Sequence, residues 1–193
     1  ATAELGKSLR AAAHPQGRLQ ALYALDGLGR LSVDDLLAAL ADANYCVRLH
    51  SLRLADSRLG EDAGLLKKMT AMVDDPDPLV RLQVAMSLGE SSKPAAVAAL
   101  VRLTRERLDE RWMKAAILSS FKDIAGELLG GLLDGKKTRP DPGLAESLAM
   151  IAGSRRHQAE LTGLIEALEK LGKDDALLIP CLRGLYRGLE HGA

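Results

Sequence analysis

A nine-residue phrase recurs along this chain about every thirty residues. Its three clear copies cover residues 17–25, 47–55 and 80–88. The second residue of each copy is an arginine, at spacings of 30 and 33 residues: Arg18, Arg48 and Arg81. A period between about 20 and 50 residues is typical of solenoids, in which each repeat buries its apolar face against its neighbours. The sequence therefore predicts a repeat fold, which more often presents a binding surface than a catalytic pocket.

The residues that start and end helices predict that the helices come in pairs. Helix formers dominate, and the β-branched runs typical of strands are missing. Asp77-Pro78 and Asp141-Pro142 indicate helix starts, because the aspartate accepts a free amide and the proline has no amide to lose. We predict an all-α fold, a right-handed α-α superhelix of about six helical pairs. The pairs are 3–13 with 16–28, 33–41 with 45–56, 62–73 with 78–89, 93–107 with 109–121, 124–133 with 142–152, and 157–171 with 174–189.

The repeat is regular in the first part of the chain and degenerate afterwards. Residues 14–122 carry the phrase, whereas over 123–193 only its spacing continues. Three other residues take the place of the arginine, at spacings of 31, 32 and 33 residues: Trp112, Leu144 and Leu177. Pro180 falls inside the last predicted helix and is expected to kink it. The chain has 193 residues, of which 47% are apolar. We predict a single repeat domain over 1–193, since this is enough for one buried core.

Composition argues against several classes of partner. Twenty-six basic residues balance 26 acidic ones, so no basic excess indicates nucleic-acid binding. Aromatic residues make up 3% of the chain, which leaves few platforms for stacked bases. No apolar run is long enough to cross a membrane. We therefore expect no nucleic-acid partner and no membrane insertion, and we expect Trp112 and Phe121 to lie in the core.

No group of residues has the pattern of a catalytic or metal site. The four histidines have no second ligand at a helical spacing: His14, His50, His157 and His191. Cys46 and Cys181 are 135 residues apart and belong to no Cys-x-x-Cys motif, so we expect packing residues rather than a disulfide, zinc or haem site. The Asp pairs at 34–35, 74–75 and 174–175 fall at helix starts or loops, where acids cap helices. We expect no catalytic residue, no cofactor and no metal, and thus a chain that is not an enzyme.

An aspartate precedes the Val-Arg pair in two copies of the phrase. Asp42 stands before Val47-Arg48, and Asp75 stands before Val80-Arg81. This pattern, followed by apolar residues at helical spacing, resembles the HEAT repeats of the bacterial HEAT-like class. In that family the Asp and Arg form a ladder between successive repeats, and Arg18 matches it without a preceding Asp. The resemblance implies a structural ladder of five residues: Arg18, Asp42, Arg48, Asp75 and Arg81.

A narrower resemblance covers residues 19–29. This stretch is similar to one in large multidomain bacterial proteins, where HEAT repeats join a sugar-dehydrogenase-like β-propeller to a c-type cytochrome domain. It implies an alternative role as the HEAT module of a secreted protein, in the periplasm or outside the cell. Without that resemblance a cytoplasmic location is expected. A further alternative is a HEAT-like lyase for bilins. The chain begins at Ala1 rather than at a methionine, which is compatible with a processed or excised chain.

A polar row beside the arginine is the candidate recognition surface. It consists of six residues: Gln20, Tyr23, His50, Arg53, Gln83 and Lys114. Four of them share one repeat position, and Tyr23 and Arg53 stand three residues further along. We expect this row to line an exposed face. The sequence therefore predicts a non-catalytic interaction scaffold or interdomain spacer, whose partner is another protein or a flanking domain of the same chain.

Overall fold

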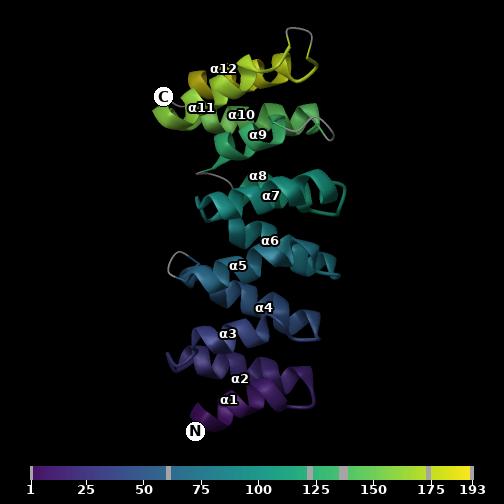
Figure 1. The fold of residues 1–193 in the computed structure, drawn as a ribbon, viewed down its shortest axis with the longest axis vertical. Helices are drawn as coiled ribbons and strands as arrows, with labels where there is room; N and C mark the ends of the chain where they lie inside the picture. The colour runs from purple at the N-terminus through teal and green to yellow at the C-terminus, as the bar shows by residue number, and fades with distance from the viewer. Residues whose placement is uncertain (1, 60–61, 121–123, 135–138, 173–174, 192–193) are drawn as a thin grey trace. The chain divides into compact units, whose positions relative to one another are not determined.

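A computed structural model describes residues 2–59, 62–120, 124–134, 139–172 and 175–191. Over these residues the protein is all-α, with twelve α-helices and two short 3-10 helices (Figure 1). The predicted all-α fold is confirmed. The chain divides into two compact units, residues 1–87 and 88–193, with the boundary inside one helix. The single domain and the right-handed superhelix stay predictions.

The first unit holds the first three helical pairs. Its elements are α1 (Thr2–Ala11), α2 (Pro15–Gly27), α3 (Val33–Ala39), α4 (Tyr45–Ala55), η1 (Asp56–Arg58), α5 (Ala63–Ala71), η2 (Met72–Asp74) and α6 (Pro78–Gly89), which contains the boundary. Helices α1, α3 and α5 contact one another in order, and α2 contacts α4. The first and second helices of the pairs thus form two separate layers.

The second unit repeats this arrangement. Its helices are α7 (Pro94–Arg107), α8 (Met113–Ser120), α9 (Ala125–Leu133), α10 (Pro142–Arg155), α11 (Gln158–Glu169) and α12 (Leu178–His191). Helix α9 lies between α7 and α11, whereas α10 lies between α8 and α12. Helix α10 therefore contacts its own partner α9 and helices of the neighbouring repeats, which explains why its sequence is apolar on several sides.

Polar side chains at the helix starts account for most of the predicted boundaries. The Ser32 hydroxyl accepts the amide of Asp35 at 3.1 Å, and the Asp35 carboxylate accepts the amide of Ser32 at 3.2 Å, a complete capping box. Asp141 accepts the amide of Leu144 at 2.9 Å. The predicted Asp-Pro starts are confirmed, since α6 and α10 begin at the two prolines.

Three local expectations are wrong. Pro180 lies in the first turn of α12, which begins at Leu178, so it removes no interior hydrogen bond. Trp112 has a left-handed backbone, with φ of 69°, and is 62% exposed rather than buried. The guanidinium of Arg111 lies 5.3 Å from the centre of its ring. Helix α8 therefore begins at Met113, later than predicted. The expected core residue Phe121 lies outside the described residues.

Candidate functional site

An arginine–aspartate pair joins the first two repeats. The Nε of Arg18 donates to Oδ2 of Asp42 at 2.6 Å, and its Nη2 donates to Oδ1 at 2.8 Å. Its Nη1 donates to the carbonyl of Ala12 at 2.8 Å, in the turn before its own helix. One guanidinium thus fastens the turn of its own repeat to the carboxylate of the next repeat.

The same geometry recurs one repeat later. Nε and Nη2 of Arg48 each lie 2.7 Å from a carboxylate oxygen of Asp75. Nη1 of Arg48 donates to the carbonyl of Asp42 at 2.8 Å, and Arg81 donates to the carbonyl of Asp75. The side chains of Arg48 and Asp75 are only 11% and 5% exposed. Arg18, Asp42, Arg48, Asp75 and Arg81 form the ladder. Its two arginine–aspartate pairs are mostly buried, and both oxygens of each carboxylate accept internal hydrogen bonds, so the pairs offer little to a ligand.

Ionisation of the ladder aspartate follows from its contacts. Burial raises the pKa of Asp42, but the hydrogen bonds from Arg18 and from the amide of Asn44 lower it more strongly. Its pKa therefore lies below the ordinary value of 3.8. The hydrogen bond to Asp75 raises the pKa of Arg48. The Arg18–Asp42 pair is therefore charged at neutral pH.

Lys114 takes the register of the ladder in the second unit. Its Nζ lies 2.6 Å from Oδ2 of Asp141, 27 residues along the chain, which is also the separation of Arg48 from Asp75. The ion pair lowers the pKa of Asp141. By sequence, Lys114 belongs to the row of Gln20, two residues after the arginine position of the repeat.

The polar row of the first unit connects its repeats. The hydroxyl of Tyr23 on α2 lies 2.6 Å from Nδ1 of His50 on α4, and their rings meet edge to face at 5.6 Å. Nε of Arg53 donates to Oε1 of Gln83 on α6 at 2.9 Å, and Nε2 of Gln83 donates to Ser87 at 3.2 Å. These side chains thus connect successive repeats of the unit, and the role of the row as a binding strip stays a prediction.

The members of the row differ in exposure. Gln20 and Arg53 are exposed and Tyr23 is 42% exposed, whereas His50 is half-buried and Gln83 is buried. Burial and the nearby Arg53 lower the pKa of His50, so its neutral ring predominates at neutral pH.

Sequence reasoning missed one exposed residue of this face. Met86 stands three residues after Gln83, as Tyr23 stands after Gln20 and Arg53 after His50. It is 44% exposed. We call Tyr23, Arg53 and Met86 the outer row. His50 and Gln83, which hold two of its members, lie behind it.

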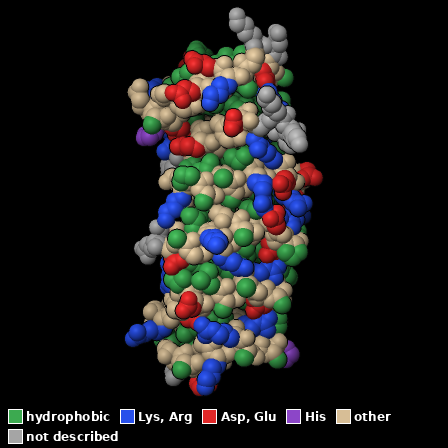
Figure 2. All heavy atoms as spheres, viewed as in Figure 1, with side chains coloured by type: hydrophobic (Ala, Val, Ile, Leu, Met, Phe, Trp, Pro, Cys, Tyr) green, Lys and Arg blue, Asp and Glu red, His purple; other side chains and the backbone are tan. Residues whose placement is uncertain are grey.

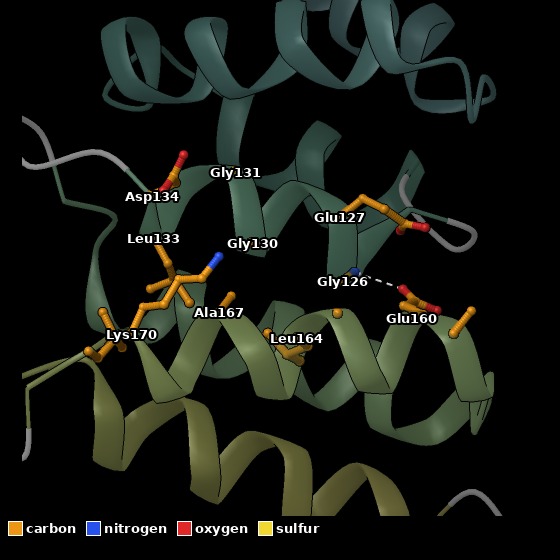
Figure 3. A pocket seen from close by; sticks show the side chains of 13 residues that line it. Gly126, Glu127, Gly130, Gly131, Leu133, Asp134, Glu160, Leu164, Ala167 and Lys170 are labelled. Atoms are coloured by element: carbon orange, nitrogen blue, oxygen red, sulfur yellow. Dashed lines mark hydrogen bonds between the residues drawn. The ribbon is translucent and has the colours of Figure 1, made fainter.

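A groove of about 530 Å³ runs between α9 and α11 in the second unit (Figure 3). Its floor is open because Gly130 and Gly163 carry no side chains there. At one end the amide of Gly126 donates to Oε1 of Glu160 at 2.7 Å, and Nη1 of Arg155 donates to Oε2 at 2.8 Å. Burial raises the pKa of Glu160. Glu160 is held by both neighbours, so it serves packing between the helices.

The described residues offer neither a metal site nor a membrane span. They contain no group of three or more His, Cys, Asp or Glu residues that could hold a metal ion. None of their helices combines the length and the apolar character that a membrane span requires. Burial and the nearby Asp175 raise the pKa of Cys181 to about 11, so its thiol stays protonated. In the view of Figure 2, basic and acidic side chains are interspersed over each unit.

The family model of HEAT repeats matches residues 33–120. Residues 33–120 are HEAT repeats. The HEAT stretch runs from the start of α3 to the end of α8 and contains the Arg48–Asp75 pair. The resemblance to HEAT repeats is thereby confirmed, whereas the narrower resemblance to multidomain dehydrogenase-like proteins stays a prediction. Comparison with curated proteins and with solved structures gave no match.

Proposed function

We propose that this chain is a non-catalytic scaffold whose outer row binds a protein partner. HEAT repeats commonly mediate protein interactions, and their family is typically non-catalytic. The observation that carries the proposal is the regular outer row itself: an exposed tyrosine, arginine and methionine at one repeat position on α2, α4 and α6. These three residue types are enriched at protein interfaces.

The contacts behind the outer row favour binding. Tyr23 is fixed by His50, and Arg53 is fixed by Gln83. Side chains that are ordered before a partner arrives lose less conformational entropy on binding. Gln20 lies beside this row and is exposed, and Lys114 is the remaining predicted contact, in the second unit. The partner is another protein or a flanking domain of the same chain, in which case the repeats act as an interdomain spacer.

Quantitative affinity capture tests the proposal. Tagged wild-type chain is compared with a Tyr23→Ala/Arg53→Glu variant and with Lys67→Glu, an exposed control on α5. We expect the double variant to lose about ten-fold or more of the enrichment of a specific partner, as hot-spot residues do, and the control to keep it. A partner set that is unchanged in the double variant would refute the outer row as the binding face.

Two narrower roles stay predictions with their own tests. A module of a secreted dehydrogenase-like protein predicts propeller strands and a Cys-x-x-Cys-His motif in the same open reading frame. A bilin lyase predicts a change in bilin absorbance when the pigment is titrated with the protein.

A further inference from the structure

His50 contacts one member of the outer row and neighbours another. Its Nδ1 atom lies 2.6 Å from the hydroxyl of Tyr23, and the two rings meet edge to face at 5.6 Å. Arg53 follows three residues later on α4, and residues at this spacing are neighbours on a helix surface. Histidine is the side chain whose ordinary pKa falls between pH 5 and 8. The proposed binding face therefore contains a group that can change its charge near neutral pH.

The surroundings of His50 favour its neutral ring. Burial is the larger cause that lowers its pKa below the ordinary value of 6.5, and the positive charge of Arg53 is the second. Gln83, the nearest member of the row on α6, carries no charge. The elements that contact α4 bring four other charged residues: Asp26 on α2, Asp35 on α3, and Asp56 and Arg58 on η1. Among the described residues, no carboxylate lies within ion-pair distance of the ring.

A partner on the outer row would remove the remaining water from this ring. His50 is half-buried already, and it lies against Tyr23 and beside Arg53, which such a partner covers. Loss of water disfavours the charged form of a histidine. The guanidinium of Arg53 also repels a protonated ring more strongly in drier surroundings. Covering the row would therefore lower the pKa of His50 further.

Partner binding and proton binding would then oppose each other. When a group has a lower pKa in a complex than in the free protein, the proton weakens the complex, because linkage is reciprocal. The affinity is complete above the pKa of His50 in the free protein and falls as the pH drops below it. The loss is about ten-fold for each pKa unit by which binding lowers the value. It ends below the pKa of the complex, where both states carry the proton.

Protonation also changes what Tyr23 offers to a partner. A protonated histidine has a hydrogen on both ring nitrogens, so its Nδ1 atom can only donate. The hydroxyl oxygen of Tyr23 must then accept at this contact, and its own hydrogen points away from the ring. The neutral ring leaves both directions of the hydrogen bond open. Proton uptake at His50 therefore alters the charge of the face and the hydrogen bonding of its tyrosine together.

We propose that His50 makes the outer row release its protein partner in mildly acidic solution. The inference rests on the proposed function, because it concerns the affinity of the same face, and it gives that face a regulation by pH. Its direction depends on what the partner places beside the ring. A carboxylate there would favour the protonated ring and reverse the effect. The partner therefore covers His50 with apolar or uncharged groups.

Affinity capture followed by washes of different pH tests the proposal. The tagged full chain captures proteins at about pH 7.5, and equal portions are washed at about pH 7.5, 6.5 and 5.5. The probe is the protein that the Tyr23→Ala/Arg53→Glu variant fails to retain. We expect the wild type to lose about ten-fold of this protein at the lowest pH.

Two histidine variants supply the controls. His50→Gln places at this position the residue that the neighbouring repeats carry there. Whatever its retention at neutral pH, that retention should be the same in all three washes. His14→Gln changes an exposed histidine that precedes α2 in the same unit, and it should release the probe as the wild type does. Circular dichroism at the lowest pH checks that all three chains are folded.

An NMR titration of the ring signals needs no partner, so it separates this inference from the proposed function. The signals of Tyr23 should follow the protonation of His50 and should stay still in His50→Gln. Tyr23 signals that ignore His50, retention that is unchanged or higher in acid, or equal release from His50→Gln would each overturn the inference, while a specific partner leaves the proposed function standing. Failure to capture any protein that depends on Tyr23 and Arg53 would refute the proposed function and this inference with it.

Discussion

At the scale of single residues, the ladder shows why a repeated arginine need not be a functional one. The guanidinium of Arg48 donates hydrogen bonds to the carboxylate of Asp75 and to the carbonyls of Asp42 and Ala43, in the turn before its helix. The resemblance to HEAT repeats predicted these residue types, yet the sequence did not indicate which aspartate each arginine would contact. Nor did the sequence indicate that Lys114 would contact Asp141.

Truncation of Arg48 should be strongly destabilising. Arg48→Ala leaves the Asp75 carboxylate buried without its cation, so we expect a loss of about 3 kcal/mol in the free energy of unfolding. Lys114→Ala removes a pair whose side chains are 47% and 46% exposed, and it should cost at most about 1 kcal/mol. Urea denaturation of the two variants measures the difference. Equal losses would show that the ladder is no stronger than a surface pair.

Asp42 predicts a specific response to acid. Its folded-state pKa lies below the ordinary 3.8, so its contribution to stability is complete above about pH 4 and is lost as the pH falls through the folded-state value. We expect Asp42→Asn to be less stable than wild type at pH 7, with a shallower decline of the unfolding free energy between about pH 4 and pH 2. Denaturant titrations across this range test it, and parallel pH profiles of the two proteins would contradict it.

At the scale of elements, helix boundaries were largely predictable because polar caps and prolines mark them. Ser32, Asn44, Asp62 and Asp141 each cap a helix that begins within a residue or so of its predicted start. The burial of a helix face was not predictable in the same way. Leu182 of α12 is apolar and yet 49% exposed, and the groove between α9 and α11 depends on glycines from two separate helices.

The contact between α10 and α12 requires glycine. A Cβ at Gly188 would collide with the carbonyl of Met150, so Gly188→Ala should lower the unfolding free energy by about 2 kcal/mol or more. A Cβ at Gly163 of α11 would meet no atom within 4 Å, and Gly163→Ala should stabilise the protein by about 0.5–1 kcal/mol through helix propensity. Thermal unfolding of both variants measures these two changes in stability. A neutral Gly188→Ala would disprove the tight crossing.

At the scale of the whole molecule, the period of the sequence predicted the all-α repeat class, because a stack of helical pairs needs the same buried positions in every repeat. The proposed binding surface was only partly predictable. The row that contains Tyr23 and His50 could be located from polarity at one position, but Met86 is apolar and a polar pattern does not include it. Its 44% exposure is a property of the folded packing that a single sequence does not reveal.

The central claim is that the outer row is the partner-binding face of a non-catalytic scaffold. Site-specific photo-crosslinking tests it most directly, with a benzophenone amino acid placed at Tyr23, Arg53 or Met86 and, as a control, at exposed Lys67 on α5. The account predicts that one partner protein is crosslinked from all three outer-row positions and not from position 67. A partner captured only from position 67, or no common partner among the three outer-row positions, would contradict it.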